Sequence, residues 1–148
     1  MKSYQHILVP VDESPISYAA VEQALALAKS LNSQVTVMSV IAVDPFFGVD
    51  FYKVAPAITD YFMQAEKNAK ERLEDIKQSF IRDGIAVDVK LIHGVSPSEG
   101  IIQVADEVSA DLIIMGSHGR TGLQKVMLGS VAQNVLTQSP IPVLIVKI

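Results

Sequence analysis

The chain has 148 residues and a formal net charge of −4, with 49% hydrophobic and 19% charged residues. These values fit one globular domain with a sizeable core, and they argue against a general affinity for nucleic acid or anionic membranes. The sequence contains no cysteine, which excludes disulfides, thiolate zinc sites and cysteine nucleophiles. The start of the chain has no secretory signal, and no apolar run reaches the ~20 residues of a spanning helix. We therefore expect residues 1–148 to form one cytoplasmic domain.

The first part of the chain alternates strand and helix signals. Residues Tyr4–Val11 are mostly apolar and β-branched, which predicts a strand covered on both faces. Ser14–Pro15 then predicts an N-cap followed by a first helical residue. This helix should run to Leu31, with Asn32 as a left-handed stop. A second strand is predicted over Gln34–Val43.

The remaining chain repeats this alternation. An apolar repeat of three and four residues predicts a long helix, and an alternating pattern predicts a third strand near the sheet edge. A capping box, Ser96–Glu99, starts a further helix. Alternating strands and helices indicate a parallel sheet with helices on both faces. The predicted elements are helices over Pro56–Asp83, from Pro97 to about Ser109 and over Ser130–Gln138, and strands over Ala86–His93, Asp111–Met115 and Val143–Ile148.

The loop Asp44–Val54 carries three aromatic side chains. They either cover the edge of a pocket or fold back on the core, and we favour the second interpretation. The three residues are Phe46, Phe47 and Phe51.

Three glycines follow the fourth predicted strand. Gly116, Gly119 and Gly129 have the spacing G-x2-G-x9-G-S, which ends at the expected helix start near Ser130. Glycine allows close approach of the backbone to a ligand, and free N–H groups at a helix start favour an anion. The segment is therefore either a phosphate-binding loop or a structural turn, and both interpretations stay open. Arg120 and Lys125 would neutralise phosphate charge, or they are exposed cations without a specific role.

The ends of the first, second and fourth strands meet at one edge of such a sheet, where ligands bind. Asp12 would accept hydrogen bonds from ribose hydroxyls, or it interacts with the dipole of the first helix. Val40, Ile41 and Met115 would sandwich a purine ring, or they are ordinary core residues. Ser130 would donate to phosphate, and it also fits a simple N-cap.

Several competing motifs are missing. Gly122 is followed by Leu123, so there is no Walker A loop, and neither the dinucleotide G-x-G-x-x-G nor the hydrolase G-x-S-x-G pattern occurs. Ser117 beside His118 is no evidence for a catalytic triad. His6, His93 and His118 lack the spacing of a metal site, and we predict none.

Three segments resemble the universal stress protein family, specifically its ATP-binding subclass. They are Val9–Asp12 followed by Ser14, the glycine segment from Gly116 to Val131, and Ser139–Val146. The resemblance covers essentially the whole chain. It implies a Rossmann-like α/β domain, with an open five-stranded parallel sheet in the order 3-2-1-4-5.

The resemblance also implies a binding site for ATP, with Mg²⁺ held through the phosphates. Asp12 would hold the ribose, and most other contacts would come from backbone groups. Around the adenine the implied residues are Pro10, Val11, Val40 and Met115, and along the sugar–phosphate path they are Gly116, His118, Gly119, Gly129, Ser130 and Val131.

The resemblance further implies a homodimer joined through the last strand. Val143–Val146 would lie at a sheet edge, where pairing with a second copy covers an apolar strand. The function that we favour is ATP binding in stress response or signalling, with slow or no hydrolysis. An ATPase or phosphotransferase using the same pocket, and a nucleotide-independent interaction module, are the alternatives. We expect no nucleic-acid or membrane partner.

Overall fold

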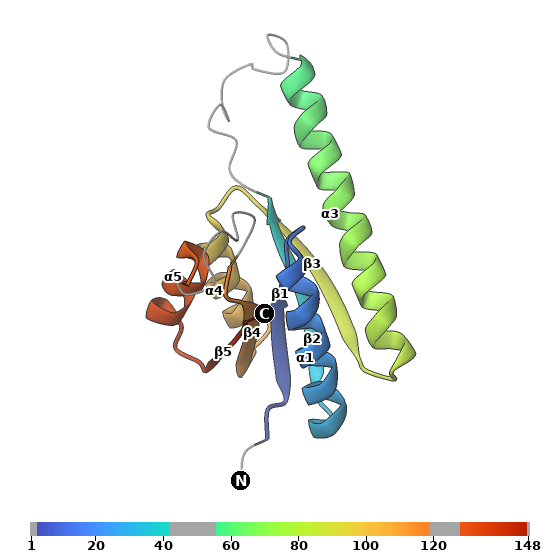
Figure 1. The fold of residues 1–148 in the computed structure, drawn as a ribbon, viewed down its shortest axis with the longest axis vertical. Coiled ribbons are helices and arrows are strands. Elements are labelled where there is room, and N and C mark those ends of the chain that lie inside the picture. Colours follow the sequence, from blue (N-terminus) through green and yellow to red (C-terminus); the bar gives the residue numbers. More distant parts are fainter. Residues whose placement is uncertain (1–2, 42–55, 119–127, 148) are drawn as a thin grey trace.

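The computed structural model describes residues 3–41, 56–118 and 128–147. Five parallel strands form one sheet in the order β3-β2-β1-β4-β5, as expected (Figure 1). The strands are β1 (His6–Pro10), β2 (Gln34–Ile41), β3 (Val87–His93), β4 (Leu112–Gly116) and β5 (Val143–Val146). The helices are α1 (Pro15–Leu31), α3 (Pro56–Arg82), α4 (Pro97–Glu107) and α5 (Ser130–Gln138).

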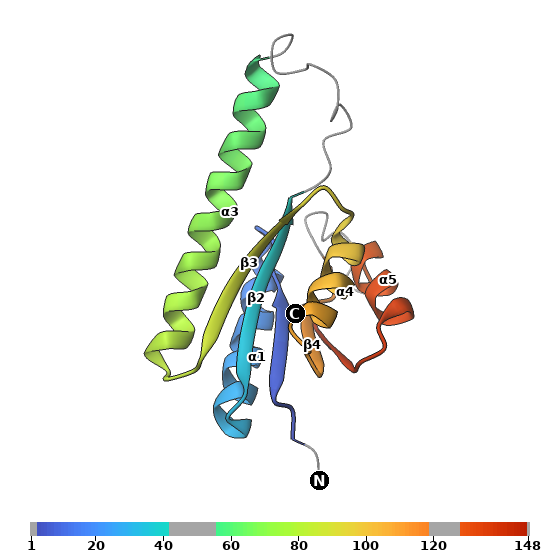
Figure 2. The same cartoon turned by 180° about the vertical axis from the view of Figure 1, so that it is seen from behind.

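The helices cover both faces of the sheet. Helices α1 and α3 lie on one face, and α4 and α5 lie on the other (Figures 1 and 2). Successive residues of β1 enter different cores: Val9 packs with α1 and α3, whereas Leu8 packs with α4 and α5. Both side chains are fully buried. This two-sided burial explains why the strand is a near-continuous apolar run.

The predicted helix signals are confirmed, with one difference. Ser14 has the extended backbone of an N-cap, Pro15 is the first helical residue, and Asn32 is left-handed at φ 55° and ψ 45°. The Ser14 hydroxyl does not cap α1, because it donates instead to the carboxylate of Asp12. In α4 the Ser96 hydroxyl accepts a hydrogen bond from the Glu99 N–H at 3.4 Å.

The two edge strands differ from the central ones in burial. Residues of β3 are mostly half-buried, which confirms its predicted place at an edge. At the opposite edge, β5 leaves the Leu144 side chain 38% exposed. Each edge strand hydrogen-bonds to one neighbour within the sheet, and no described residue pairs as a strand with its other side.

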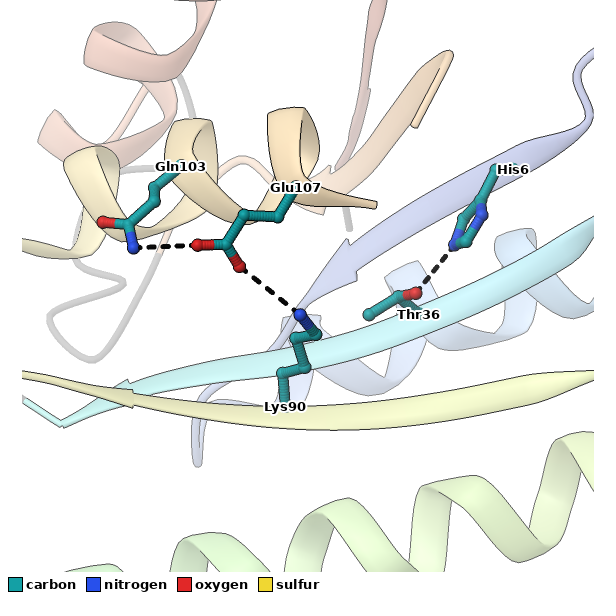
Figure 3. Close-up of polar contacts among 5 residues, drawn as sticks. All are labelled: His6, Thr36, Lys90, Gln103 and Glu107. Carbon is teal, nitrogen blue, oxygen red and sulfur yellow. Dashed lines mark hydrogen bonds and ion pairs between the residues drawn. The ribbon is translucent and has the colours of Figure 1, made fainter. Parts of the chain in front are cut away.

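Two groups of polar side-chain contacts link neighbouring elements (Figure 3). One joins α4 to β3, and the other joins the first residue of β1 to β2. Glu107 accepts hydrogen bonds from Gln103 at 3.0 Å and from Lys90 at 3.4 Å, which hold the pKa of its carboxyl below the ordinary value. His6 Nε2 lies 2.7 Å from Thr36 Oγ1 and shares a hydrogen bond with it.

Some predictions fall outside the described residues. These concern the aromatic side chains of the loop 44–54, the end of the second strand beyond Ile41, and the roles of Arg120 and Lys125. Within residues 3–41, 56–118 and 128–147, no helix is both long enough and apolar enough to span a membrane.

Candidate functional site

The candidate site lies where the strand order reverses. Strands β1 and β4 are neighbours, but their connections lead to opposite sides of the sheet, which opens a crevice at their carboxyl ends. Pairing continues one residue past β1, since the Val11 N–H donates to the Met38 carbonyl at 2.8 Å. The Ser39 hydroxyl donates to the Val11 carbonyl at 2.6 Å. These bonds fix the position of Asp12 at the mouth of the crevice.

A cavity of about 330 Å³ occupies this crevice. Of the eleven residues that the family resemblance assigns to the nucleotide, ten line it, and the eleventh, Gly119, lies outside the described residues. Ile41 is not among the lining residues, although it was expected beside Val40. The predicted residues that line the cavity are Pro10, Val11, Asp12, Val40, Met115, Gly116, His118, Gly129, Ser130 and Val131.

The Asp12 carboxylate uses its two oxygens differently. Oδ1 accepts from the Ser14 N–H at 2.8 Å, from the Ser14 hydroxyl and from the Ser17 hydroxyl at 2.9 Å. Ser17 Oγ also accepts from the Asp12 N–H at 2.9 Å. Among the described residues, no hydrogen bond reaches Oδ2. The carboxylate is therefore held rigidly through one oxygen, while the other is available to a ligand.

The glycine segment is tied together at its base. The Gly129 N–H donates to the Ser117 carbonyl at 2.7 Å, so this N–H cannot also bind a phosphate as the sequence suggested. Gly129 is the N-cap of α5 and Ser130 is the first helical residue, so the simple N-cap interpretation of Ser130 is wrong. The N–H groups of the first helical turn have no partner within the helix. They remain suited to an anion, together with the exposed Ser130 side chain.

Gly116 has a packing role. A Cβ added there would lie 2.9 and 3.1 Å from the side-chain carbons of Ile16. Any larger residue would push α1 away from β4 or force Ile16 to move. The glycine therefore allows close contact between α1 and β4, and it also forms part of the cavity wall.

His118 contributes an unsatisfied polar atom. Its Nδ1 lies 2.9 Å from the hydroxyl of Ser117, which is 2% exposed, and this contact orients the ring. Its Nε2 is buried and has no hydrogen-bond partner among the described residues. Buried polar atoms normally have partners, so a ligand atom in the cavity would complete this one. The buried Ser117 hydroxyl does not line the cavity and is not placed as a nucleophile.

A family model described as the universal stress protein family matches residues 3–147. The chain belongs to the universal stress protein family. It is 33% identical to universal stress protein MJ0531 of Methanocaldococcus jannaschii, over 97% of this chain and 82% of the relative. The solved structure of MJ0577, a universal stress protein of the same organism, matches with a TM-score of 0.82 and 31% identity, over 99% of this chain and 98% of that chain.

Another solved relative is a universal stress protein in complex with cAMP. It matches with a TM-score of 0.72 and 26% identity, over 98% of both chains. Relatives that cover nearly the whole chain support the predicted family and the five-stranded sheet.

Sequence reasoning missed six lining residues of this universal stress protein. They reach the cavity from elements far apart in the chain, so no local spacing identified them. Ser17 and Ser39 had the clearest signal, as polar residues where apolar ones are expected. The missed residues are Ser17, Met38, Ser39, Pro97, Ile101 and Ala132.

The cavity of this universal stress protein combines three kinds of wall. Apolar side chains, including Val40, Ile101 and Met115, line the cavity, and such a lining suits an aromatic ring. A carboxylate oxygen can accept from hydroxyls, and a helix N-terminus can hold an anion. Within residues 3–41, 56–118 and 128–147, no group of three or more potential metal ligands occurs.

Proposed function

We propose that this universal stress protein binds an adenine nucleotide, ATP above all, and acts in the cytoplasm in stress response or signalling. The observation that carries the proposal is the Asp12 carboxylate, whose Oδ1 is saturated and whose Oδ2 has no bond from the described residues. A pair of ribose hydroxyls supplies the donors that Oδ2 lacks. The cAMP complex of a relative supports an adenine nucleotide as the ligand class.

The remaining walls fit the rest of the ligand. We place the adenine between Val40 of β2 and Met115 of β4, which line the cavity from the two strands that flank β1. The phosphates point towards the first turn of α5, where Ser130 and Val131 offer backbone N–H groups. Mg²⁺ would be held through the phosphates.

Hydrolysis should be slow. Of the described residues that line the cavity, only Asp12 and His118 carry a carboxylate or an imidazole that could orient an attacking water. Asp12 is assigned to the ribose, which the α- and β-phosphates separate from the terminal phosphate. Fast phosphoryl transfer needs a residue that orients the attacking group. Binding without rapid turnover is the function that these walls favour.

Thermal unfolding in the presence of nucleotides tests the proposal. A ligand that binds only the folded state raises the melting temperature, and the rise grows with the logarithm of its concentration over Kd. We expect ATP with Mg²⁺, and AMP to a smaller extent, to raise it, whereas ribose 5-phosphate should have little effect because it lacks the adenine. An unchanged melting temperature at millimolar ATP would rule out the site.

We also propose that two copies pair through β5. No described strand pairs with its outer side, and its Leu144 side chain is partly exposed. Pairing of β5 with β5 of a second copy about a two-fold axis would satisfy the free backbone groups and cover this side chain.

A further inference from the structure

A second cavity, of about 280 Å³, adjoins the first. It lies on the other side of the β1 and β2 ends, against α3. The two cavities share four lining residues, namely Val11, Asp12, Ser39 and Val40. Asp12 therefore stands at the junction, where a ribose held by its carboxylate would present its 2′ and 3′ oxygens to both cavities.

The α3 wall of this cavity carries groups that recognise nucleotides. Gln64, Asn68 and Arg72 follow each other at four-residue intervals, which places them on one helical face. Gln64 Nε2 donates to Asn68 Oδ1 at 2.9 Å. The Nδ2 group of Asn68 therefore remains as a donor for a ligand. Amide groups suit base edges, and the ring of Tyr61 at the rim, 65% exposed, suits base stacking.

Arg72 is available for an anion. Arg72 is half-buried as a residue, and in the part of the chain that the structure describes its guanidinium has no ion pair or hydrogen bond. The nearby cation Lys70, by contrast, is exposed and pairs with Glu66 at 3.4 Å. A free guanidinium beside a cavity is well suited to phosphate oxygens.

The charges of the walls limit the kind of phosphate. Asp12 and Glu13 also line the second cavity, and Arg72 is the one cation among its described lining residues. A phosphate monoester with two charges would carry more charge than the single guanidinium among the described lining residues can neutralise. A phosphodiester carries a single charge, which one guanidinium can neutralise.

We propose that the second cavity binds a second nucleotide, joined by a phosphodiester to the 3′ oxygen of the nucleotide at Asp12. The 2′ hydroxyl remains free to donate to Asp12 Oδ2, Arg72 contacts the diester, and the second base lies against Tyr61 and Asn68. The two cavities have similar volumes, so each has room for a nucleoside-sized group. This inference rests on the proposed nucleotide site.

Calorimetric titration with two probes tests the inference. The probes are AMP and the linear dinucleotide 5′-phosphoadenylyl-(3′→5′)-adenosine. We expect the dinucleotide to bind about tenfold tighter than AMP, the gain typical of a charge-assisted contact. Arg72→Gln should remove most of this gain and Asn68→Ala part of it, with AMP affinity and thermal unfolding unchanged. Lys70→Gln, a change on the same helix outside the cavity lining, should keep the full gain.

Two results would overturn the inference while leaving the proposed function intact. One is equal affinity of the wild type for AMP and the dinucleotide. The other is a gain that survives both Arg72→Gln and Asn68→Ala. If the wild type binds neither probe, the proposed nucleotide site itself is wrong.

Discussion

At the scale of single residues, Asp12 shows how one side chain serves both the fold and the ligand. Its Oδ1 ties the end of β1 to the start of α1 through Ser14 and Ser17. Its Oδ2 faces no donor among the described residues. The two interpretations that the sequence left open, a residue of the helix start and a ribose ligand, are thus compatible.

Gly116 gives a prediction about packing. Gly116→Ala should lower the free energy of unfolding by about 1–3 kcal/mol, because the new methyl group meets Ile16 at about 3 Å. Urea denaturation measures this change. In an Ile16→Ala background the same substitution should cost much less, and equal costs in both backgrounds would contradict the contact.

His6 gives a prediction about pH. Burial lowers the pKa of His6 below its ordinary value of 6.5, partly opposed by the carboxylates of Asp111 and Asp88. Below that value the unfolded chain binds a proton that the folded chain binds less readily, so the free energy of unfolding should fall as the pH drops through the interval between the two pKa values.

The matched variant is His6→Gln, which keeps a hydrogen-bonding group near Thr36. Denaturation measured from neutral to mildly acidic pH should show a shallower loss of stability in the variant. Glu107 does not interfere with this measurement. The pKa of its carboxyl is lowered from an ordinary value of 4.5, so the stability that it contributes is lost only at more acidic pH. Identical slopes for both proteins would show that His6 is not the source.

At the scale of elements, α4 approaches β2 through a glycine. A Cβ on Gly100 would lie 2.8 Å from Cγ2 of Val40, which lines the nucleotide cavity. Alanine is favoured over glycine in a helix by about 1 kcal/mol, so Gly100→Ala should change stability little. The displaced Val40 should narrow the cavity and weaken ATP binding several-fold.

Fluorescence or calorimetric titration checks this prediction. Val40→Ala also removes an adenine contact, so the comparison is a double-mutant cycle, in which Gly100→Ala should lower the affinity for ATP less in the Val40→Ala background than in the wild type. If Gly100→Ala binds ATP as the wild type does, α4 does not shape the cavity through this contact.

The elements themselves were largely predictable, because each has a local signal. Apolar runs predicted the central strands, and Pro15 and Asn32 predicted the two ends of α1. The side-chain contacts between elements were not predictable. The Ser14 hydroxyl binds Asp12 instead of capping its helix, and the contact of Gly100 with Val40 joins residues without any sequence relation.

At the scale of the whole molecule, the proposed dimer predicts the effect of a charge on β5. Leu144→Lys should convert a dimer into a monomer, because lysine at a paired strand edge would be buried next to its own symmetry mate. Light scattering coupled to gel filtration measures the mass. Ile81→Lys, also at an exposed apolar position but on α3, should remain dimeric.

A wild-type mass equal to that of one chain would refute the dimer. A Leu144→Lys protein that stays dimeric would place the interface elsewhere.

The candidate site was predictable where strand ends supply its residues. A parallel sheet brings Asp12, Val40 and Met115 to one edge, so topology and sequence suffice to group them. The sequence did not predict that Ile41 faces the second cavity, nor that the Gly129 N–H is used within the loop. Both features depend on the direction in which one side chain or one N–H group points, which a sequence pattern does not specify. The roles of the lining residues as nucleotide contacts stay predictions.

The central claim is that Asp12 holds the ribose of an adenine nucleotide. Calorimetric titration of ATP with Mg²⁺ into the wild type and Asp12→Asn tests it most directly. Asparagine keeps an oxygen for Ser14 and Ser17 but replaces the second oxygen by an amide that cannot accept from the ribose. We predict one ATP per wild-type chain and an affinity about tenfold or more lower in the variant, with 2′,3′-dideoxy-ATP binding equally to both. Absence of ATP binding to the wild type, or equal affinity of both proteins for ATP, would contradict the claim.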